Sequence, residues 1–156
     1  MQPSDEAGLC DYSYLTHRLQ NELSRAERHG RSLSLVRLEI DNPTALEATS
    51  RKQQLRVNRL LSQGCRKTDV AGHHVEGGYA LILPETGASG AFTVAERIRE
   101  ELTAQGNSEL KLSASAGVAS YPAHAANLDD LIKQASNALE LAKNSGRNRV
   151  CSPENP

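Results

Sequence analysis

Aromatic residues are scarce in this chain. Only 3% of its 156 residues are Phe, Trp or Tyr, and there is no Trp. The core must therefore be built from Leu, Ile, Val and Ala, which supply the apolar area that drives folding. With 38% hydrophobic and 24% charged residues, the composition is that of a globular protein. The length fits one domain with a core of its own.

Cysteine is equally sparse. The three cysteines, Cys10, Cys65 and Cys151, lie far apart in the chain. Their spacing matches no metal site, and their odd number implies no disulfide framework. Reduced thiols in a cytoplasm are the simplest interpretation, so we expect a cytoplasmic protein.

Long apolar runs are also missing. No stretch approaches the length of a membrane-spanning helix, and residues 1–10 show neither the basic segment nor the apolar run of a signal peptide. The formal net charge of −1 provides no field over the whole surface that would attract nucleic acid or anionic lipid. We expect no nucleic-acid partner and no membrane insertion. Any anionic ligand must be held by a local cluster of Arg or Lys.

The apolar periodicity that is present predicts alternating helices and strands. Helices are predicted around residues 15–26, 57–64, 91–102 and 128–142, and strands around 33–40, 70–75, 79–83, 112–121 and 149–151. Gly77 and Gly78 separate two adjacent strands and predict a hairpin. The order α-β-α-β-β-α-β-α-β favours an α/β (α+β) fold, with a central mixed sheet flanked by helices. We expect a flexible N-terminus at 1–10, the domain at 11–152 and a tail at 153–156.

Several segments, in order, resemble one known family. Residues 139–150 read LELAKNSGRNRV and residues 114–122 read ASAGVASYP. Residues 28–31, 38–41, 80–86 and 95–99 match the beginning and middle of the same pattern. From about Leu15 to Val150 the chain therefore resembles the GGDEF domains of diguanylate cyclases. The resemblance implies the palm-like sheet of nucleotide cyclases, in agreement with the order of elements.

The catalytic positions of that family are altered here. The family joins two GTP molecules through attack of a ribose hydroxyl on an α-phosphate, which requires metal ions. Gly77 and Gly78 stand where the family's turn has carboxylates, and Glu47 replaces its guanine-binding Asn. We therefore predict that cyclase activity is lost, that the chain is no enzyme, and that it holds no magnesium or other cofactor. The degenerate active-site positions are Glu39, Glu47, Val75, Glu76, Gly77, Gly78 and Tyr79.

A second family motif is retained. Active relatives often carry an inhibitory R-x-x-D site shortly before the turn, and residues 66–69 read RKTD at that spacing. A guanidinium can donate two parallel hydrogen bonds to guanine O6 and N7 or to a phosphate. A carboxylate can accept from the guanine N1 and N2 hydrogens. The resemblance implies cyclic di-GMP binding by Arg66, Lys67, Thr68, Asp69 and Arg97. The alternative is a chance motif in which Arg66 and Asp69 pair with each other at a helix end.

The predicted function is that of a catalytically inactive signalling domain. It would bind cyclic di-GMP and relay the signal to a protein partner or an attached sensor domain, with a ligand-bridged dimer as one arrangement. The alternative is an interaction module that binds no nucleotide. Lys143 either contacts phosphate, as in the family, or complements the C-terminal dipole of the last helix. Cys65 either has a pKa lowered by Arg66 or is a small apolar residue at a helix end.

Overall fold

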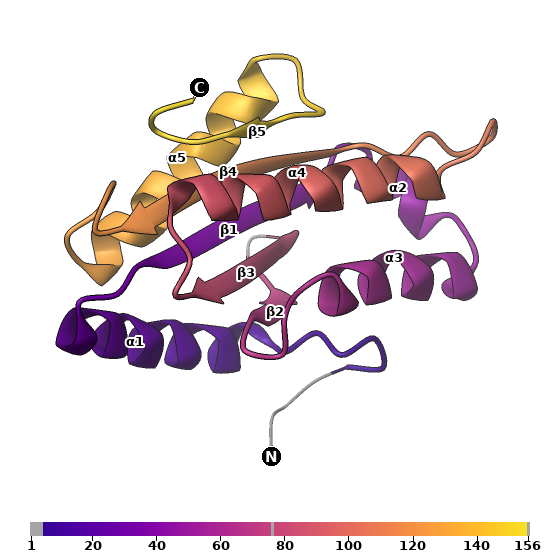
Figure 1. Ribbon diagram of the computed structural model, residues 1–156. Coiled ribbons are helices and arrows are strands. Elements are labelled where there is room, and N and C mark those ends of the chain that lie inside the picture. The colour runs from indigo at the N-terminus through magenta and orange to yellow at the C-terminus, as the bar shows by residue number, and fades with distance from the viewer. Residues whose placement is uncertain (1–4, 76, 156) are drawn as a thin grey trace.

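The computed structural model describes residues 5–75 and 77–155, and its elements follow the predicted order with one addition (Figure 1). The elements are α1 Tyr12–His29, β1 Leu33–Ile40, α2 Pro43–Glu47, α3 Arg51–Gln63, β2 Val70–His73, β3 Tyr79–Pro84, α4 Ala88–Gln105, β4 Ala114–Tyr121, α5 Leu128–Asn144 and β5 Val150–Cys151. The additional helix is α2, whose five residues are too few to show periodicity. It begins at Pro43, because the fixed φ of proline suits the first turn of a helix.

The strands form one mixed sheet in the order β2-β3-β1-β4-β5. Strand β1 lies at the centre and pairs antiparallel with both β3 and β4, while β4 pairs parallel with β5. Leu33 lies opposite Pro84, and Leu38 lies opposite Tyr79. The predicted fold class is confirmed. This register also places the turn before β3 at the carboxyl end of β1, and the segment after β3 at its amino end.

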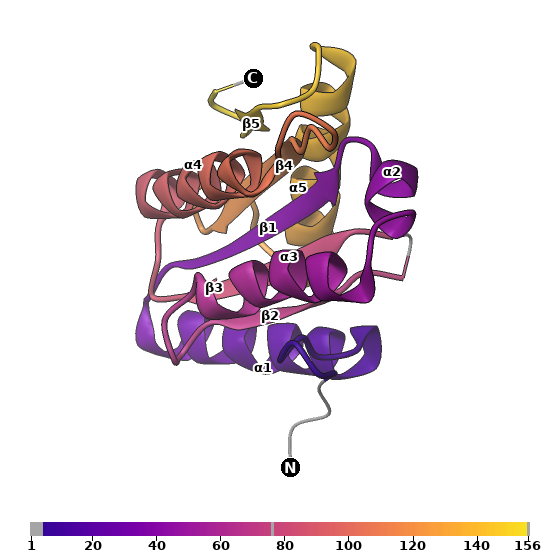
Figure 2. The ribbon, with the colours of Figure 1, turned by 90° about the vertical axis from the view of Figure 1, so that its right-hand side faces the viewer.

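Helices cover both faces of the sheet (Figures 1 and 2). Helices α3 and α4 pack on one face, where Leu61 and Ile98 join a buried cluster with Val36 of β1. Helices α1 and α5 pack on the other face, where Leu19 joins a cluster with Leu35. Apolar aliphatic side chains thus fill both layers, as the shortage of aromatic residues requires. The sites described below lie at the two ends of β1, where the strands give way to loops.

The segment before α1 belongs to the packed domain. Residues 1–10 were expected to be a flexible N-terminus, and the structure describes 5–10 of them. Leu9 and Cys10 are buried. The Cys10 amide donates to the Ala71 carbonyl at 3.0 Å, and the His73 amide donates to the Cys10 carbonyl at 2.9 Å. The segment therefore extends the sheet beyond β2, and the predicted boundary at residue 11 falls inside the packed structure.

Membrane insertion was not expected. In the described ranges 5–75 and 77–155, no helix combines the length and the apolar character needed to cross a bilayer. The cytoplasmic location and the absence of a nucleic-acid partner stay predictions.

Candidate functional site

The first candidate site is a hollow of about 360 Å³ at the carboxyl end of β1. It forms because the pairing of Leu38 with Tyr79 folds the hairpin turn over the end of β1. We call this hollow the turn pocket. It is lined by Glu39, Ile40, Pro43, Leu46, Glu47, Gln54, Asn58, His73, Gly77, Gly78 and Tyr79. The fold thus gathers most of the predicted active-site positions. Val75 is not among the lining residues and is 68% exposed, and Glu76 lies outside the described residues.

The two glycines of the turn have different surroundings. Both have a positive φ, 96° at Gly77 and 76° at Gly78. A Cβ atom at Gly78 would lie 2.5 Å from the Leu38 carbonyl oxygen and 2.7 Å from Glu39 Cγ, whereas nothing lies within 4 Å of one at Gly77. Gly78 is therefore required by the close approach of the turn to β1. A carboxylate side chain at this position would need β1 and Glu39 to move.

Glu39 is engaged by cations of its own chain. Its Oε1 accepts a hydrogen bond from Lys143 Nζ at 3.0 Å, and its Oε2 lies 3.7 Å from Nη2 of the buried Arg37. The hydrogen bond to Glu39 raises the pKa of Lys143 above its usual value. Lys143 therefore neutralises Glu39, a role that neither predicted interpretation included.

The turn pocket offers few oxygen donors for a divalent cation. Such cations are held by several oxygen ligands. The pocket presents the carboxylates of Glu39 and Glu47, and the first is already paired with Lys143. Among the described residues, no three His, Cys, Asp or Glu side chains gather closely enough to hold a metal. These donors do not fit a pair of cations bound by protein side chains. The expectation that no cofactor is bound stays a prediction.

Asp41, two residues beyond Glu39, holds the end of β1 in place. Its Oδ2 accepts from Ser113 Oγ at 2.5 Å and from the Asn148 amide at 3.1 Å, and its Oδ1 accepts from Ser115 Oγ at 2.6 Å. These bonds join β1 to β4 and to the loop after α5. Asp41 therefore fixes the wall of the turn pocket rather than facing a ligand.

The second candidate site lies at the opposite end of β1, in residues 64–69, which we call the arginine turn. Nη2 of Arg66 donates to Asp69 Oδ1 at 3.0 Å, to the Pro84 carbonyl at 2.8 Å and to Thr86 Oγ1 at 2.7 Å. The hydrogen bond to Asp69 raises the pKa of Arg66, so the group stays cationic. The Arg66 guanidinium is thus held in one orientation while its side chain is 58% exposed.

The other predicted ligand residues differ in exposure and in their contacts with the arginine turn. Arg97, on α4, donates from Nη2 to the Gly64 carbonyl, so a second guanidinium flanks the same turn. Lys67 and Thr68 are exposed. The Asp69 side chain is only 2% exposed, and its Oδ2 also accepts from the Arg66 amide at 2.9 Å. Asp69 therefore orients Arg66. The Arg66–Asp69 pairing of the alternative interpretation is present, but it leaves Arg66 at the surface.

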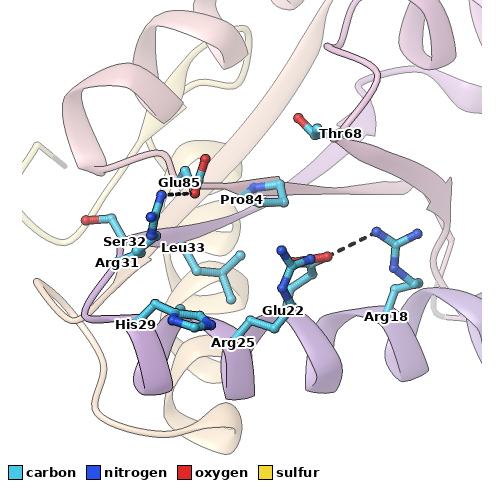
Figure 3. Close-up of a pocket in the computed structure, with 11 residues that line it drawn as sticks. Arg18, Glu22, Arg25, His29, Arg31, Ser32, Leu33, Thr68, Pro84 and Glu85 are labelled. Carbon is cyan, nitrogen blue, oxygen red and sulfur yellow. Dashed lines mark hydrogen bonds and ion pairs between the residues drawn. The ribbon is translucent and has the colours of Figure 1, made fainter.

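A hollow beside the arginine turn was not predicted. This α1 pocket has a volume of about 320 Å³ and lies between α1 and the end of β3 (Figure 3). Glu22 is 7% exposed there, and its carboxylate pairs with Arg18 at 3.1 Å and Arg25 at 3.4 Å. The α1 pocket is lined by Arg18, Glu22, Arg25, Ala26, His29, Arg31, Ser32, Leu33, Thr68, Pro84 and Glu85. The spacing of Arg18, Glu22 and Arg25 places them on one helix face, and this is the signal that could have found the pocket.

Cys65 has the properties of an apolar residue. Burial raises the pKa of its thiol to about 11. Its Sγ lies 3.7 Å from the Leu61 carbonyl, one turn earlier in the chain. Of the two predicted interpretations, the structure favours a small apolar side chain over a reactive thiolate.

Known proteins share this sequence pattern and fold. The family model described as "Diguanylate cyclase, GGDEF domain" matches residues 7–149. Diguanylate cyclase DosC of Escherichia coli (strain K12) is 28% identical over 152 residues, which cover 91% of this chain and 33% of DosC. The chain thus spans about a third of the length of the curated relatives it matches.

Two solved structures illustrate the likeness in fold. The GGDEF domain of DgcB from Caulobacter crescentus, in complex with c-di-GMP, has a TM-score of 0.80 at 22% identity, covering 97% of this chain and 95% of that chain. Diguanylate cyclase SiaD from Pseudomonas aeruginosa, in complex with its activator SiaC, has a TM-score of 0.80 at 26% identity, covering 94% of this chain and 60% of that chain.

The relatives correct one prediction. The altered turn at Gly77 and Gly78 led to the prediction that the chain is no enzyme. The curated relatives are named as diguanylate cyclases, which contradicts it. The lack of carboxylates in one turn does not exclude metal-binding oxygen atoms that come from the substrate or from residues elsewhere in a longer protein. Since the family match extends over nearly all of the described residues, the chain belongs to the GGDEF domain family of diguanylate cyclases.

Proposed function

We propose that the arginine turn binds cyclic di-GMP and that this binding is relayed to a protein partner. One observation carries the proposal: Arg66 is locked in orientation by Asp69, Pro84 and Thr86 and is still 58% exposed. A guanidinium that is already ordered loses little conformational entropy when it binds a planar or anionic group. A fixed, exposed arginine is therefore suited to recognition.

The chemistry of the turn suits a cyclic dinucleotide. The hydrogen bonds of Arg66 within the structure engage its Nε and Nη2, so its Nη1 can donate to guanine O6 or N7 or to a phosphate. Arg97 is 51% exposed and flanks the same turn, so two cations face one ligand that carries two phosphates. Because Asp69 is already occupied by Arg66, we assign it the orienting role. Contact with the guanine N1 and N2 hydrogens is not part of the proposal.

The α1 pocket extends this surface. Thr68 of the arginine turn lines this pocket, and so does Pro84, whose carbonyl accepts a hydrogen bond from Arg66. Arg18 and Arg25 supply positive charge on the α1 side, partly balanced by Glu22. A ligand with two guanines and two phosphates offers separate groups to the turn and to the pocket. We therefore include Arg25 as a secondary contact.

The proposed relay rests on the bivalent nature of the ligand. Cyclic di-GMP has two equivalent halves, so one half can bind Arg66 while the other meets a second copy of the domain or a different protein. The similar domain of DgcB was crystallised with c-di-GMP, and SiaD with a protein activator. Light scattering with and without cyclic di-GMP distinguishes a ligand-bridged dimer from a monomeric complex.

Titration calorimetry with cyclic di-GMP tests the proposal. We expect heat of binding from the unaltered chain, binding weakened at least tenfold in Arg66→Ala, and a smaller loss in Arg25→Ala. The matched control for Arg25→Ala is Arg28→Ala, since Arg28 is exposed on α1, like Arg25, but does not line the α1 pocket. Equal binding by Arg66→Ala would exclude the arginine turn. Absence of heat at high micromolar ligand would favour the interaction module without nucleotide.

A further inference from the structure

The solvent face of α3 carries an unusual row of cations. Lys52, Arg56 and Arg59 are all exposed and are spaced at i, i+4 and i+7, which places them on one face of the helix. None of the three pairs with a carboxylate of the described residues, and no other helix in the described part of the chain carries two Lys or Arg side chains outside an ion pair. The row is thus a local excess of charge in a chain whose net charge is −1.

This row borders a groove between α3 and α4. The groove has a volume of about 600 Å³. Its floor includes the half-buried Leu60, and its α4 rim includes Glu101 and Gln105. A half-buried leucine beside a line of cations matches an amphipathic helix that is acidic along one edge. Its carboxylates at i, i+4 and i+7 would repeat along the axis at the spacing of the three cations.

We propose that the α3–α4 groove docks an acidic amphipathic helix of a partner protein. The α4 rim argues for this occupant over a membrane or nucleic acid. Glu101 lines the groove and is 49% exposed, so a flat anionic bilayer or a long polyanion would meet a carboxylate beside the cations. A single helix can avoid this rim, because only one of its edges carries charge. The proposal goes beyond nucleotide binding and does not depend on it.

Fluorescence anisotropy with synthetic peptides tests the proposal without any nucleotide, so its failure is distinct from failure at Arg66. The probe is a labelled helical peptide with Leu on one face and Glu at i, i+4 and i+7. The control peptide has the same composition, with the three Glu on different faces. We expect the first peptide to bind at least tenfold more tightly than the second.

Two triple variants complete the test. Lys52→Glu/Arg56→Glu/Arg59→Glu reverses the groove charges, whereas Arg28→Glu/Lys111→Glu/Lys133→Glu makes the same change in net charge at scattered exposed positions. We expect a loss of at least tenfold in peptide affinity for the groove variant and a change under threefold for the control. Equal losses in both variants, equal binding of both peptides, or tighter groove-dependent binding of duplex DNA or phosphatidylserine vesicles would overturn the proposal.

Discussion

At the scale of single residues, the turn before β3 is governed by space and backbone conformation. Gly78 lies against the Leu38 carbonyl and Glu39, whereas no atom lies within 4 Å of a Cβ placed at Gly77. The sequence showed that both positions lack a carboxylate. It did not show that only one of them requires glycine for packing, because that depends on how closely a turn approaches a strand far away in the chain.

Gly78→Ala should therefore destabilise the fold more than Gly77→Ala. Both substitutions place a Cβ at positive φ, at a cost of about 1–2 kcal/mol. Gly78→Ala adds the overlap with β1, worth about 1–3 kcal/mol more. Urea unfolding of the two variants measures the difference. Equal free energies of unfolding would show that the approach to β1 is relaxed at no cost.

Tyr79 should titrate late. Burial raises the pKa of its phenol to about 12, and its hydroxyl donates to Asn58 Oδ1 at 2.7 Å. Since the ordinary tyrosine pKa is about 10, the folded state holds this proton more tightly than the unfolded state. The resulting stability is fully present below pH 10 and is lost as pH rises towards 12.

Absorbance at 295 nm checks this prediction. The difference between the unaltered chain and Tyr79→Phe isolates one of the four tyrosines. We expect this difference to titrate with a pKa of about 12. A difference curve centred near the ordinary value of about 10 would mean that Tyr79 is open to solvent.

At the scale of elements, sequence periodicity identified the strands and the long helices. The strand at 33–40 was predicted with the bounds of β1, because apolar residues and flanking polar turns mark both of its ends. Helix α2 was missed because five residues are too short for a period to show. The predicted strand at 70–75 extended two residues too far, since β2 ends at His73 and the chain then turns. The packing of residues 5–10 against β2 is a contact between distant segments, which periodicity does not report.

Asp41 connects three elements, so its removal should destabilise the whole domain. It accepts from Ser113, Ser115 and the Asn148 amide. Hydrogen bonds to charged groups contribute about 1.5–3 kcal/mol each, and some of this is recovered by water at a half-buried site. We expect Asp41→Ala to lower the free energy of unfolding by about 2–4 kcal/mol.

The control for this prediction is Glu27→Ala, at an exposed position of α1, which should change stability by less than about 0.5 kcal/mol. A double-mutant cycle with Ser115→Ala assigns the effect to the hydrogen bond. Additive effects of Asp41→Ala and Ser115→Ala would show that the two side chains are not coupled.

At the scale of the whole molecule, the register of β1 separates two regions. The turn pocket lies at its carboxyl end, and the arginine turn lies at its amino end with the α1 pocket beside it. The candidate ligand residues at 66–69 were identified from sequence through their place in a family pattern. The α1 pocket was not, because it depends on α1 packing against the end of β3; the burial of the Asp69 side chain was not, because a four-residue motif does not report tertiary packing. The separation implies that a ligand at one region need not occupy the other.

Cyclic di-GMP binding at the arginine turn is tested by an amide chemical-shift titration of the ¹⁵N-labelled chain with this ligand. Binding at Arg66 predicts the largest shifts in residues 64–69 and at Arg97, smaller shifts along the face of α1 that carries Arg25, and little change at Glu47 and Tyr79. Shifts centred on the turn pocket, with residues 64–69 unmoved, would show that the ligand binds at the carboxyl end of β1 and not at Arg66.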